Sequence, residues 1–276
     1  MPELPEVEVI LHQLRERVLG STIKEIQLYR EDMIQAGRSA LPWYAGARID
    51  TITRRGKSLV FTCLKHNQPR YLLAQLGMTG LFLFHPSHVR HAKHLHLKLN
   101  LDQALESTLY YWNPRRFGRI HLFNADQLGI FCRRRFGPDA YTIGQDEFYT
   151  LVKNSRGRIK ALLLNQHALA GIGNIYANEI LFRAGIHPYA KGNGLRKTTI
   201  CGLYHAMRSI LKEAIEWGGS TIQDFHHPNG LRGRYQERHA VYHKDGTPCP
   251  HGCSTSITRL TDERSSFICE TCQKPR

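Results

Sequence analysis

The sequence predicts an α+β fold, and three observations carry that prediction. Short alternating or β-branched segments dominate residues 1–130, helical stripes dominate from residue 141 onward, and four of the seven cysteines lie between residues 249 and 276. Many short strands separated by turn residues favour a β-sandwich or a barrel for the first part. A length of 276 residues accommodates two ordinary domains, or two and a small module.

In the first part, a helix is expected over 6–19, because Val7, Ile10, Leu14 and Val18 recur at helical spacing and Gly20 follows as a stop. Alternation or β-branched apolar runs then predict a series of strands. These lie at 49–54, 58–64, 71–76, 94–100 and 119–123.

The character of the chain changes at a basic run that leads into Gly137 and Pro138, which predicts a linker over 133–140. Helical stripes follow at 146–153, 159–169, 175–183 and 198–217. A polar, Gly- and His-rich stretch over 218–238 has little periodicity and is expected to be a mobile loop. The predicted division is a β-sandwich domain over 1–132, the linker, a helical domain over 141–237 and a cysteine-bearing module over 238–276.

The net charge is +15, with 38 Lys and Arg against 23 Asp and Glu. An excess of this size favours a polyanionic partner, with nucleic acid ahead of an anionic membrane surface; a charge that merely keeps the protein soluble is the remaining alternative. There is no apolar run of about 18 residues and no secretory signal pattern at the N-terminus, so we expect a cytoplasmic, nucleoid-associated protein with no membrane segment.

The terminal cysteines follow the pattern C-x3-C, fifteen residues, C-x2-C, which is typical of a structural zinc site. The expected ligands are Cys249, Cys253, Cys269 and Cys272. His251, inside the first pair, is a conceivable substitute for one of them. Four unligated thiols or a redox pair are the alternatives. With four protein ligands the Zn²⁺ would have no open position for chemistry.

The N-terminus has chemistry of its own if Met1 is removed, because Pro2 then carries a free secondary amine. Such an amine can attack C1′ of a deoxyribose and form an iminium, which acidifies the C2′ proton and promotes loss of the 3′ phosphate. Glu3 and Glu6 place carboxyl groups nearby for proton transfer. Taken alone, a Pro-Glu start is more often a flexible terminus.

The opening M-P-E-L-P-E-V-E resembles that of bacterial formamidopyrimidine-DNA glycosylases, which are relatives of the endonuclease VIII group. Further motifs match in the same order over essentially the whole chain. They are R-R-G-K (54–57), L-G-M-T-G (76–80), K-H-L-H (93–96), N-P-R-R-F-G (113–118), I-K (159–160), G-I-G-N-I-Y-A-N-E (171–179), A-G-I-H-P, G-G-S-T-I-Q-D-F, V-Y and the terminal cysteines.

The resemblance implies a catalytic set: Pro2 as the Schiff-base nucleophile, Glu3 as the general acid and base, Glu6 as a supporting carboxylate, and Lys57 at the phosphate or the lesion nucleotide. It also implies that a wedge fills the gap left by an everted nucleotide. A flexible apolar side chain, a stacking ring and a hydrogen-bonding guanidinium suit that task. For Met78 and Phe117, packing in the core is the alternative. The wedge residues are Met78, Arg115 and Phe117.

The remaining implied DNA contacts are His94 and Arg116 in the first domain and Lys160, Asn174 and Arg264 beyond it. Asn174 opens the helix after a glycine pair, in what the family has as a helix–two-turn–helix phosphate clamp, and a plain N-cap is its other interpretation. Arg264 precedes Cys269 and matches the zinc-finger arginine of the family, which has a β-hairpin there; a solvated charge is the alternative.

The implied activity is that of a bifunctional DNA glycosylase and AP lyase. It would act as a monomer on duplex DNA that contains oxidised purines or abasic sites, and would finish by β,δ-elimination. An endonuclease VIII-like enzyme for oxidised pyrimidines and a non-catalytic damaged-DNA-binding protein are the alternatives. Several departures from the family pattern leave the lesion and opposite-base preferences open. They are Gln75 for His, Leu95 and Asn113 for Asp, His243 for Gly, and the extra residue between Cys249 and Cys253.

Overall fold

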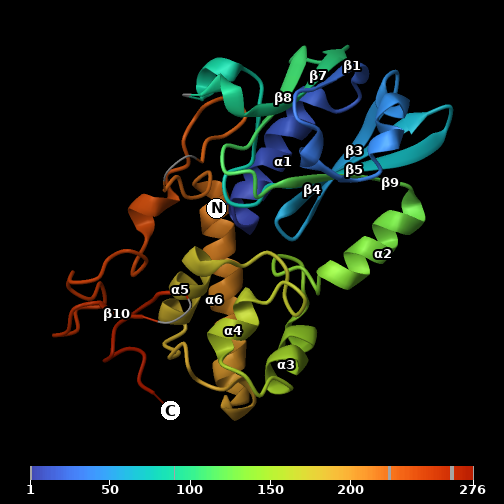
Figure 1. Ribbon diagram of the computed structural model, residues 1–276. Coiled ribbons are helices and arrows are strands. Elements are labelled where there is room, and N and C mark those ends of the chain that lie inside the picture. The colour runs from blue at the N-terminus through green and yellow to red at the C-terminus, as the bar shows by residue number, and fades with distance from the viewer. Residues whose placement is uncertain (1, 90, 223–224, 262–263, 276) are drawn as a thin grey trace. The chain divides into compact units, whose positions relative to one another are not determined.

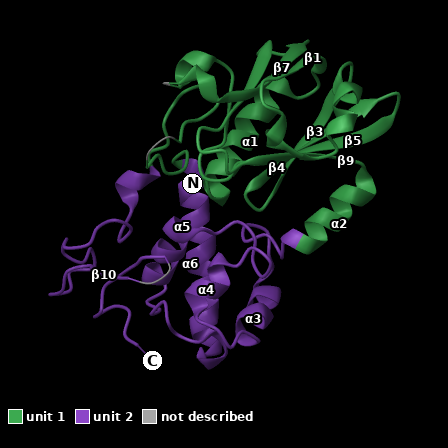
Figure 2. Cartoon of the chain, viewed as in Figure 1, with its two compact units in different colours: residues 1–134, 217–234 green, residues 135–216, 235–276 purple. Residues whose placement is uncertain are grey.

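A computed structural model of the chain describes residues 2–89, 91–222, 225–261 and 264–275 (Figure 1). The chain divides into two compact units (Figure 2). Unit 1 comprises residues 1–134 and 217–234, and unit 2 comprises residues 135–216 and 235–276. Segment 217–234, which the sequence assigns to the helical domain, is therefore grouped with the strand-rich half.

Unit 1 holds α1 (Leu4–Val18) and almost all of α2 (Ala125–Arg135). It also holds short 3₁₀ turns at Glu31–Met33, Arg38–Tyr44, Pro86–His88 and Ala92–His94. Its strands are β1 (Thr22–Leu28), β2 (Ile34–Ala36), β3 (Arg48–Arg55), β4 (Ser58–Lys65), β5 (Gln68–Gln75), β6 (Leu81–Leu83), β7 (Leu95–Asp102), β8 (Thr108–Trp112) and β9 (Arg119–Phe123).

The strands form one sheet in the order β2-β9-β5-β4-β3-β1-β7-β8-β6, and all neighbours except β2 and β9 are antiparallel. The sheet thus consists of two ladders, β2-β9-β5-β4-β3 and β1-β7-β8-β6. Only one residue pair, Thr22 on β1 with Arg48 on β3, joins them. The rings of Phe61 on β4 and Phe82 on β6 nevertheless lie 5.3 Å apart. Strands that are distant in the order thus face each other, so the sheet folds over into the predicted sandwich.

Helix α1 begins at a capping box, in which the Glu3 side chain accepts from the Glu6 backbone and the Glu6 side chain accepts from the Glu3 backbone. Its stripe, including Val7, Ile10 and Leu14, is buried in the core that both ladders share. The helix that the sequence predicts is confirmed, and it starts two residues earlier because of the cap.

Unit 2 is helical, and α5 and α6 pack side by side (Figure 1). Its helices are α3 (Gln145–Lys153), α4 (Ile159–Leu164), α5 (Asn174–Arg183) and α6 (Lys197–Glu216), with 3₁₀ turns at Gly192–Gly194 and Tyr235–Arg238. The last two strands, β10 (Thr258–Leu260) and β11 (Ser266–Ile268), form an antiparallel hairpin.

Two predicted elements differ from the structure. Helix α4 ends at Leu164 instead of residue 169, because the Asn165 side chain accepts from the His167 backbone and turns the chain. The predicted linker begins inside α2. This helix was not predicted, because none of its residues is buried and its sequence therefore has no apolar stripe. The reciprocal bonds of Asn124 and Gln127 at its start are the signal that was available.

The stretch over 218–238, which the sequence predicts to be a mobile loop, makes backbone contacts within unit 1, and its mobility stays a prediction. Arg234 N donates to Trp217 O at 2.9 Å, and Phe84 N donates to Pro228 O at 2.9 Å. Its absence of periodicity reflects irregular backbone, which does not require mobility. Within the described part of the chain, no helix is long and apolar enough to cross a membrane.

Candidate active site and nucleic-acid interface

Pro2, Glu3 and Glu6 are all buried at the start of α1, and Glu6 connects two distant parts of unit 1. Its Oε2 accepts from Glu3 N at 2.8 Å and its Oε1 accepts from Ser220 N at 2.7 Å. A carboxylate with backbone donors on both oxygens orients its neighbours. Glu6 therefore fixes the backbone of Glu3 against segment 217–234; Met1, on whose removal the Pro2 chemistry depends, lies outside the described residues.

Two glycines explain why segment 217–234 approaches Glu6 so closely. Gly218 and Gly219 both have positive φ, at 76° and 74°. A Cβ on Gly219 would lie 2.9 Å from Glu6 Oε1. The carbonyl of Gly218 bonds His227 Nε2 at 2.7 Å, and burial lowers the pKa of that histidine. A neutral imidazole thus closes the turn beside the carboxylate.

Lys57 is half-buried in the turn between β3 and β4. That turn is fastened to α1 by a largely buried ion pair between Arg54 Nε and Glu8 Oε2 at 2.5 Å. Arg54 also donates to Gly56 O at 3.1 Å. The sequence analysis missed Glu8 and Arg54, although a charged residue on the buried side of an amphipathic helix is a recognisable signal.

The predicted wedge residues lie on two loops that touch. Met78 is 39 % exposed and Phe117 is 56 % exposed, so neither belongs to the core. The Arg115 guanidinium lies 5.3 Å from the centre of the Phe117 ring. A Cβ on Gly77, which has φ +63°, would lie 2.5 Å from the Phe117 backbone, so only glycine allows this contact.

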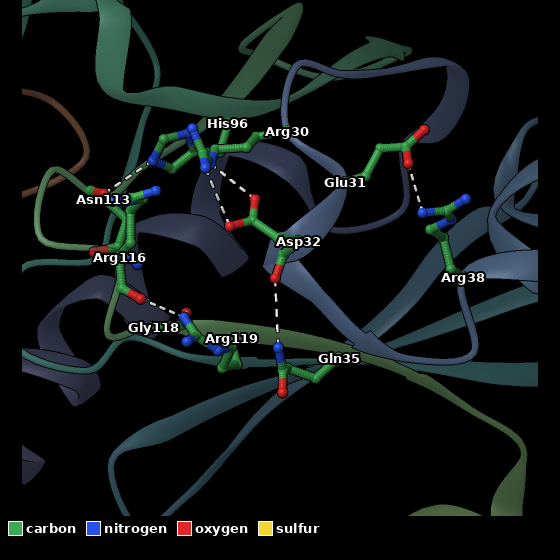
Figure 3. A network of polar contacts seen from close by, with 10 residues as sticks. All are labelled: Arg30, Glu31, Asp32, Gln35, Arg38, His96, Asn113, Arg116, Gly118 and Arg119. Atoms are coloured by element: carbon green, nitrogen blue, oxygen red, sulfur yellow. Dashed lines mark hydrogen bonds and ion pairs between the residues drawn. The ribbon is translucent and has the colours of Figure 1, made fainter.

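His94 and Arg116 lie near the same loops. His94 is half-buried, its ring is 6.4 Å from that of Trp112, and desolvation lowers its pKa. Arg116 is exposed and has a left-handed backbone, with φ 55°. Its carbonyl accepts from the Arg119 guanidinium, which holds this strained turn in place (Figure 3).

In unit 2 the structure brings Lys160, Asn174 and Arg264 together. Lys160 is buried, and its ammonium group donates to Arg264 O at 3.0 Å, Ser265 O at 2.8 Å and Ser266 Oγ at 2.8 Å. Asn174 Nδ2 donates to Ser265 O at 3.1 Å. Lys160 thus holds the segment that carries the exposed Arg264 side chain, whereas a direct bond from Lys160 to phosphate stays a prediction.

Beside this cluster lies a cavity of about 440 Å³ with a cationic lining. Arg158, Lys160 and Arg264 line it together with Asn165 and Tyr189, and the Arg158 guanidinium lies 4.2 Å from the centre of the Tyr189 ring. A concave surface with this charge suits a phosphate group. Arg158 was not predicted, because a lone arginine at a helix start carries no distinctive pattern.

Helix α5 docks the C-terminal segment with a further set of side chains. The N-cap of α5 is Gly173 and not Asn174, which corrects one interpretation of that residue. Glu179 is buried and accepts from the backbone amides of Ala240, Val241 and Tyr242 at 2.8, 3.0 and 2.8 Å. Desolvation raises the pKa of Glu179, against the opposing effect of these donors.

The four terminal cysteines form a group in which the sulfur atoms all lie within 4.8 Å of one another, so they can hold a metal ion. Cys249 and Cys253 approach Cys272 with Sγ–Sγ distances of 3.8 and 3.3 Å. Sulfur atoms about 2.3 Å from a tetrahedral ion have separations of this order. His251 stacks on Phe182 with ring centres 4.6 Å apart, and its Nδ1 lies 3.5 Å from Cys272 Sγ.

Exposed loops that carry arginine beside apolar and aromatic side chains, together with a separate cationic cavity, are typical of nucleic-acid-binding proteins. Comparison with known proteins identifies the family within this class. Residues 1–120 match the family model of the formamidopyrimidine-DNA glycosylase N-terminal domain, and residues 136–226 match that of the formamidopyrimidine-DNA glycosylase H2TH domain. The chain belongs to the formamidopyrimidine-DNA glycosylase family.

Individual relatives agree with this assignment. The chain is 40 % identical to a formamidopyrimidine-DNA glycosylase of Thermus thermophilus, over 99 % of this chain and 98 % of the relative, and 35 % identical to that of Bacillus subtilis, over 99 % of both. The crystal structure of the MutM (Fpg) protein from Thermus thermophilus has a TM-score of 0.85 at 38 % identity and covers all of both chains. A Lactococcus lactis Fpg bound to DNA with an abasic site has a TM-score of 0.87 at 31 % identity, over 99 % of this chain and 100 % of that one.

Proposed function

We propose that this protein is a bifunctional DNA glycosylase and AP lyase that removes oxidised purines, including 8-oxoguanine and formamidopyrimidines, from duplex DNA. The observation that carries the proposal is the placement of Pro2 and Glu3 at the buried start of α1, where Glu6 fixes the backbone. The names of the relatives and a Lactococcus lactis Fpg mutant in complex with Fapy-dG DNA support the purine class.

In this mechanism, the Pro2 amine, exposed by removal of Met1, attacks C1′ as the bond to the damaged base breaks. Glu3 protonates the sugar ring oxygen, which opens the ring and gives an iminium between Pro2 and C1′. The iminium draws electrons from the C2′–H bond, so loss of that proton expels the 3′ phosphate. A second elimination expels the 5′ phosphate, and water then releases the sugar fragment from Pro2.

The DNA must be opened before this chemistry, because a stacked nucleotide does not expose C1′ to the amine. Met78 and Phe117 fill the space left in the stack, and Arg115 bonds the orphaned base. Lys57, His94 and Arg116 hold the backbone in unit 1, while Asn174 and Arg264, with Lys160 behind them, hold phosphates in unit 2. Segment 217–234 covers the everted base.

The ion that fits the four thiolates is Zn²⁺, because their number and spacing suit tetrahedral sulfur coordination. Cys249, Cys253, Cys269 and Cys272 would hold it with no position left for substrate, so its role is to stabilise the hairpin behind Arg264. We also propose a cytoplasmic monomer and keep the four-part division as a functional one, although segment 217–234 of the predicted helical domain is grouped with unit 1.

Borohydride trapping tests the chemistry, since it reduces the iminium to a stable adduct. We expect the protein, shown by intact mass to lack Met1, to form an adduct with duplex DNA that contains 8-oxoguanine. Pro2→Gly should lose the adduct and keep DNA binding. An adduct with oxidised pyrimidines alone would favour an endonuclease VIII-like enzyme, and no adduct with any lesion would favour a protein that only binds damaged DNA.

A salt series tests the DNA assignment separately. Several contacts between cationic side chains and phosphates release counterions on binding, so the affinity for duplex DNA should fall steeply as salt concentration rises. An affinity that is independent of salt would contradict the phosphate contacts proposed for both units.

A further inference from the structure

The side chain at position 113 lies at the centre of a hydrogen-bond chain between the two wedge loops. Asn113 is 0 % exposed. Its Oδ1 accepts from Thr79 Oγ1 at 3.2 Å, and its Nδ2 donates to Tyr111 Oη at 3.2 Å. A buried amide that is bonded at both ends has a fixed orientation.

The first loop is connected to this amide through Thr79, the residue that follows Met78. The hydroxyl of Thr79 accepts from Arg115 N at 3.3 Å and donates to Asn113. One hydroxyl therefore links the neighbour of Met78, the backbone of Arg115 and the buried amide. The direction of every bond is defined, because the Arg115 amide can only donate and Oδ1 can only accept.

The second loop is held by the backbone of Asn113, and the other end of the amide leads through Tyr111 to the end of β5, just before the first loop. Tyr111 Oη, which accepts from Asn113, lies 3.3 Å from Gln75 O. Burial raises the pKa of Tyr111, so its hydroxyl keeps the proton that it donates to this carbonyl. Asn113 O accepts from Arg116 N at 3.2 Å.

Close packing leaves this chain little freedom. A Cβ on Gly118 would lie 2.0 Å from Tyr111 Oη and 2.6 Å from Asn113 Nδ2. On the other side, His96 Nε2 lies 2.9 Å from Asn113 O (Figure 3). His94 O accepts from Asn113 N at 3.0 Å. A small shift of the amide would therefore displace both loops together.

We propose that Asn113 is a positioning residue that joins the loops of Met78, Arg115 and Phe117 into one preassembled wedge, and so sets how efficiently the enzyme opens a duplex. This inference rests on the proposed function. Opening a duplex requires the wedge to enter as the nucleotide leaves, so loops that move independently would lose more conformational entropy at that step. DNA that is already open does not require this step.

The test compares two substrates in single-turnover assays. One is duplex DNA that contains 8-oxoguanine, for which base release is measured, and the other is an abasic site in single-stranded DNA, for which borohydride trapping is measured. We expect Asn113→Ala to slow base release from the duplex by up to about 100-fold and to change trapping on the single strand by less than about threefold. Asn100→Ala, a half-buried asparagine on β7 that bonds Glu25 away from the wedge, should change neither rate.

Two further variants keep the test decisive if Asn113→Ala folds poorly. Thr79→Val cuts the same link from the first loop and should show the same selective loss. Asn113→Asp keeps an acceptor for Thr79 and should lie between Asn113→Ala and the unmodified protein. The double variant Asn113→Ala with Thr79→Val should be no slower than the worse single variant, because both changes break one link.

The outcomes separate this inference from the proposed function. If the unmodified protein fails to trap an abasic site in both duplex and single-stranded DNA, the proposed chemistry is wrong, whatever position 113 does. If the unmodified protein traps it, and the variants either retain the full rate on the duplex or lose both rates equally, Asn113 does not position the wedge.

Discussion

Each unit contains a buried glutamate that accepts backbone amides from a segment distant in sequence. Glu6 in unit 1 bonds Glu3 N and Ser220 N, and Glu179 in unit 2 bonds the amides of Ala240, Val241 and Tyr242. The first holds residues beside the proposed nucleophile, and the second holds the approach to the cysteine hairpin. The same device therefore supports the proposed catalytic residues in unit 1 and the proposed DNA contacts in unit 2.

The largest expected difference between the units is the response to metal removal. A small cysteine hairpin depends on its ion for folding, and structural zinc contributes on the order of 10 kcal/mol in isolated modules. A chelator should therefore raise amide hydrogen exchange in residues 244–275 and leave β3–β5 of unit 1 protected. Unchanged exchange in the hairpin would show that α4 and α5 hold it without metal.

Loss of the Glu179 side chain should have the next largest effect. Glu179→Ala leaves buried amides of residues 240–242 without their acceptor, which we expect to lower the free energy of unfolding by about 4 kcal/mol. Thermal unfolding measures this change. Glu216→Ala removes an exposed glutamate of α6 and is the control, with an expected change near zero.

Glu6→Ala removes the acceptor that the amides of Glu3 and Ser220 share, and we expect it to lower the free energy of unfolding by about 3 kcal/mol. Its effect on chemistry should be larger than that of Glu179→Ala, because Glu3 and segment 217–234 lose their common anchor. Trapping on an abasic site and the unfolding temperature are to be measured together, with exposed Glu16→Ala on the same helix as control. Equal trapping by Glu6→Ala and the unmodified protein would remove the distinction between the two glutamates.

Acid should weaken unit 2 through His239, the residue before the segment that Glu179 holds. Burial lowers the pKa of His239 from 6.5 to about 4. Between these values the unfolded chain binds a proton that the folded chain does not, so stability falls as the pH is lowered through this interval, by about 2 kcal/mol. Unfolding curves at pH 7 and pH 4.5 should show a smaller difference for His239→Gln, and an unchanged difference would contradict this assignment.

The smallest effect is expected at His243, where the family pattern has glycine. Its φ is 57°, a conformation that favours glycine, and its ring centre lies 4.4 Å from that of Tyr242 and 5.1 Å from that of Phe267. His243→Gly relieves backbone strain of about 1 kcal/mol and loses ring contacts that contribute about 1 kcal/mol. Because the two effects have opposite signs, the free energy of unfolding should change by less than about 1 kcal/mol. A loss well above that value would show that the ring contacts dominate.

Local pattern determined much of this molecule. The stripe of α1, the alternation in β3, β7 and β9, the β-branched apolar run of β4 and the paired cysteines depend on residues close in sequence, so the printed order reveals them. The collinear motifs also placed Met78 and Phe117 outside the core. Helix α2 was not predicted, because it has no buried face and therefore no apolar stripe in its sequence.

The sequence by itself determined α1, α3 to α6, five of the strands in unit 1, the cationic character, the cysteine site and the family resemblance, since each depends on composition or on short spacings. Only the tertiary structure decided that Glu6 meets Ser220, that Glu8 pairs with Arg54, that Lys160 holds the Arg264 segment and that Asn113 links the wedge loops. These contacts join residues up to 214 positions apart. Which distant polar groups share a buried site depends on how the chain folds back on itself, and no local pattern encodes that pairing.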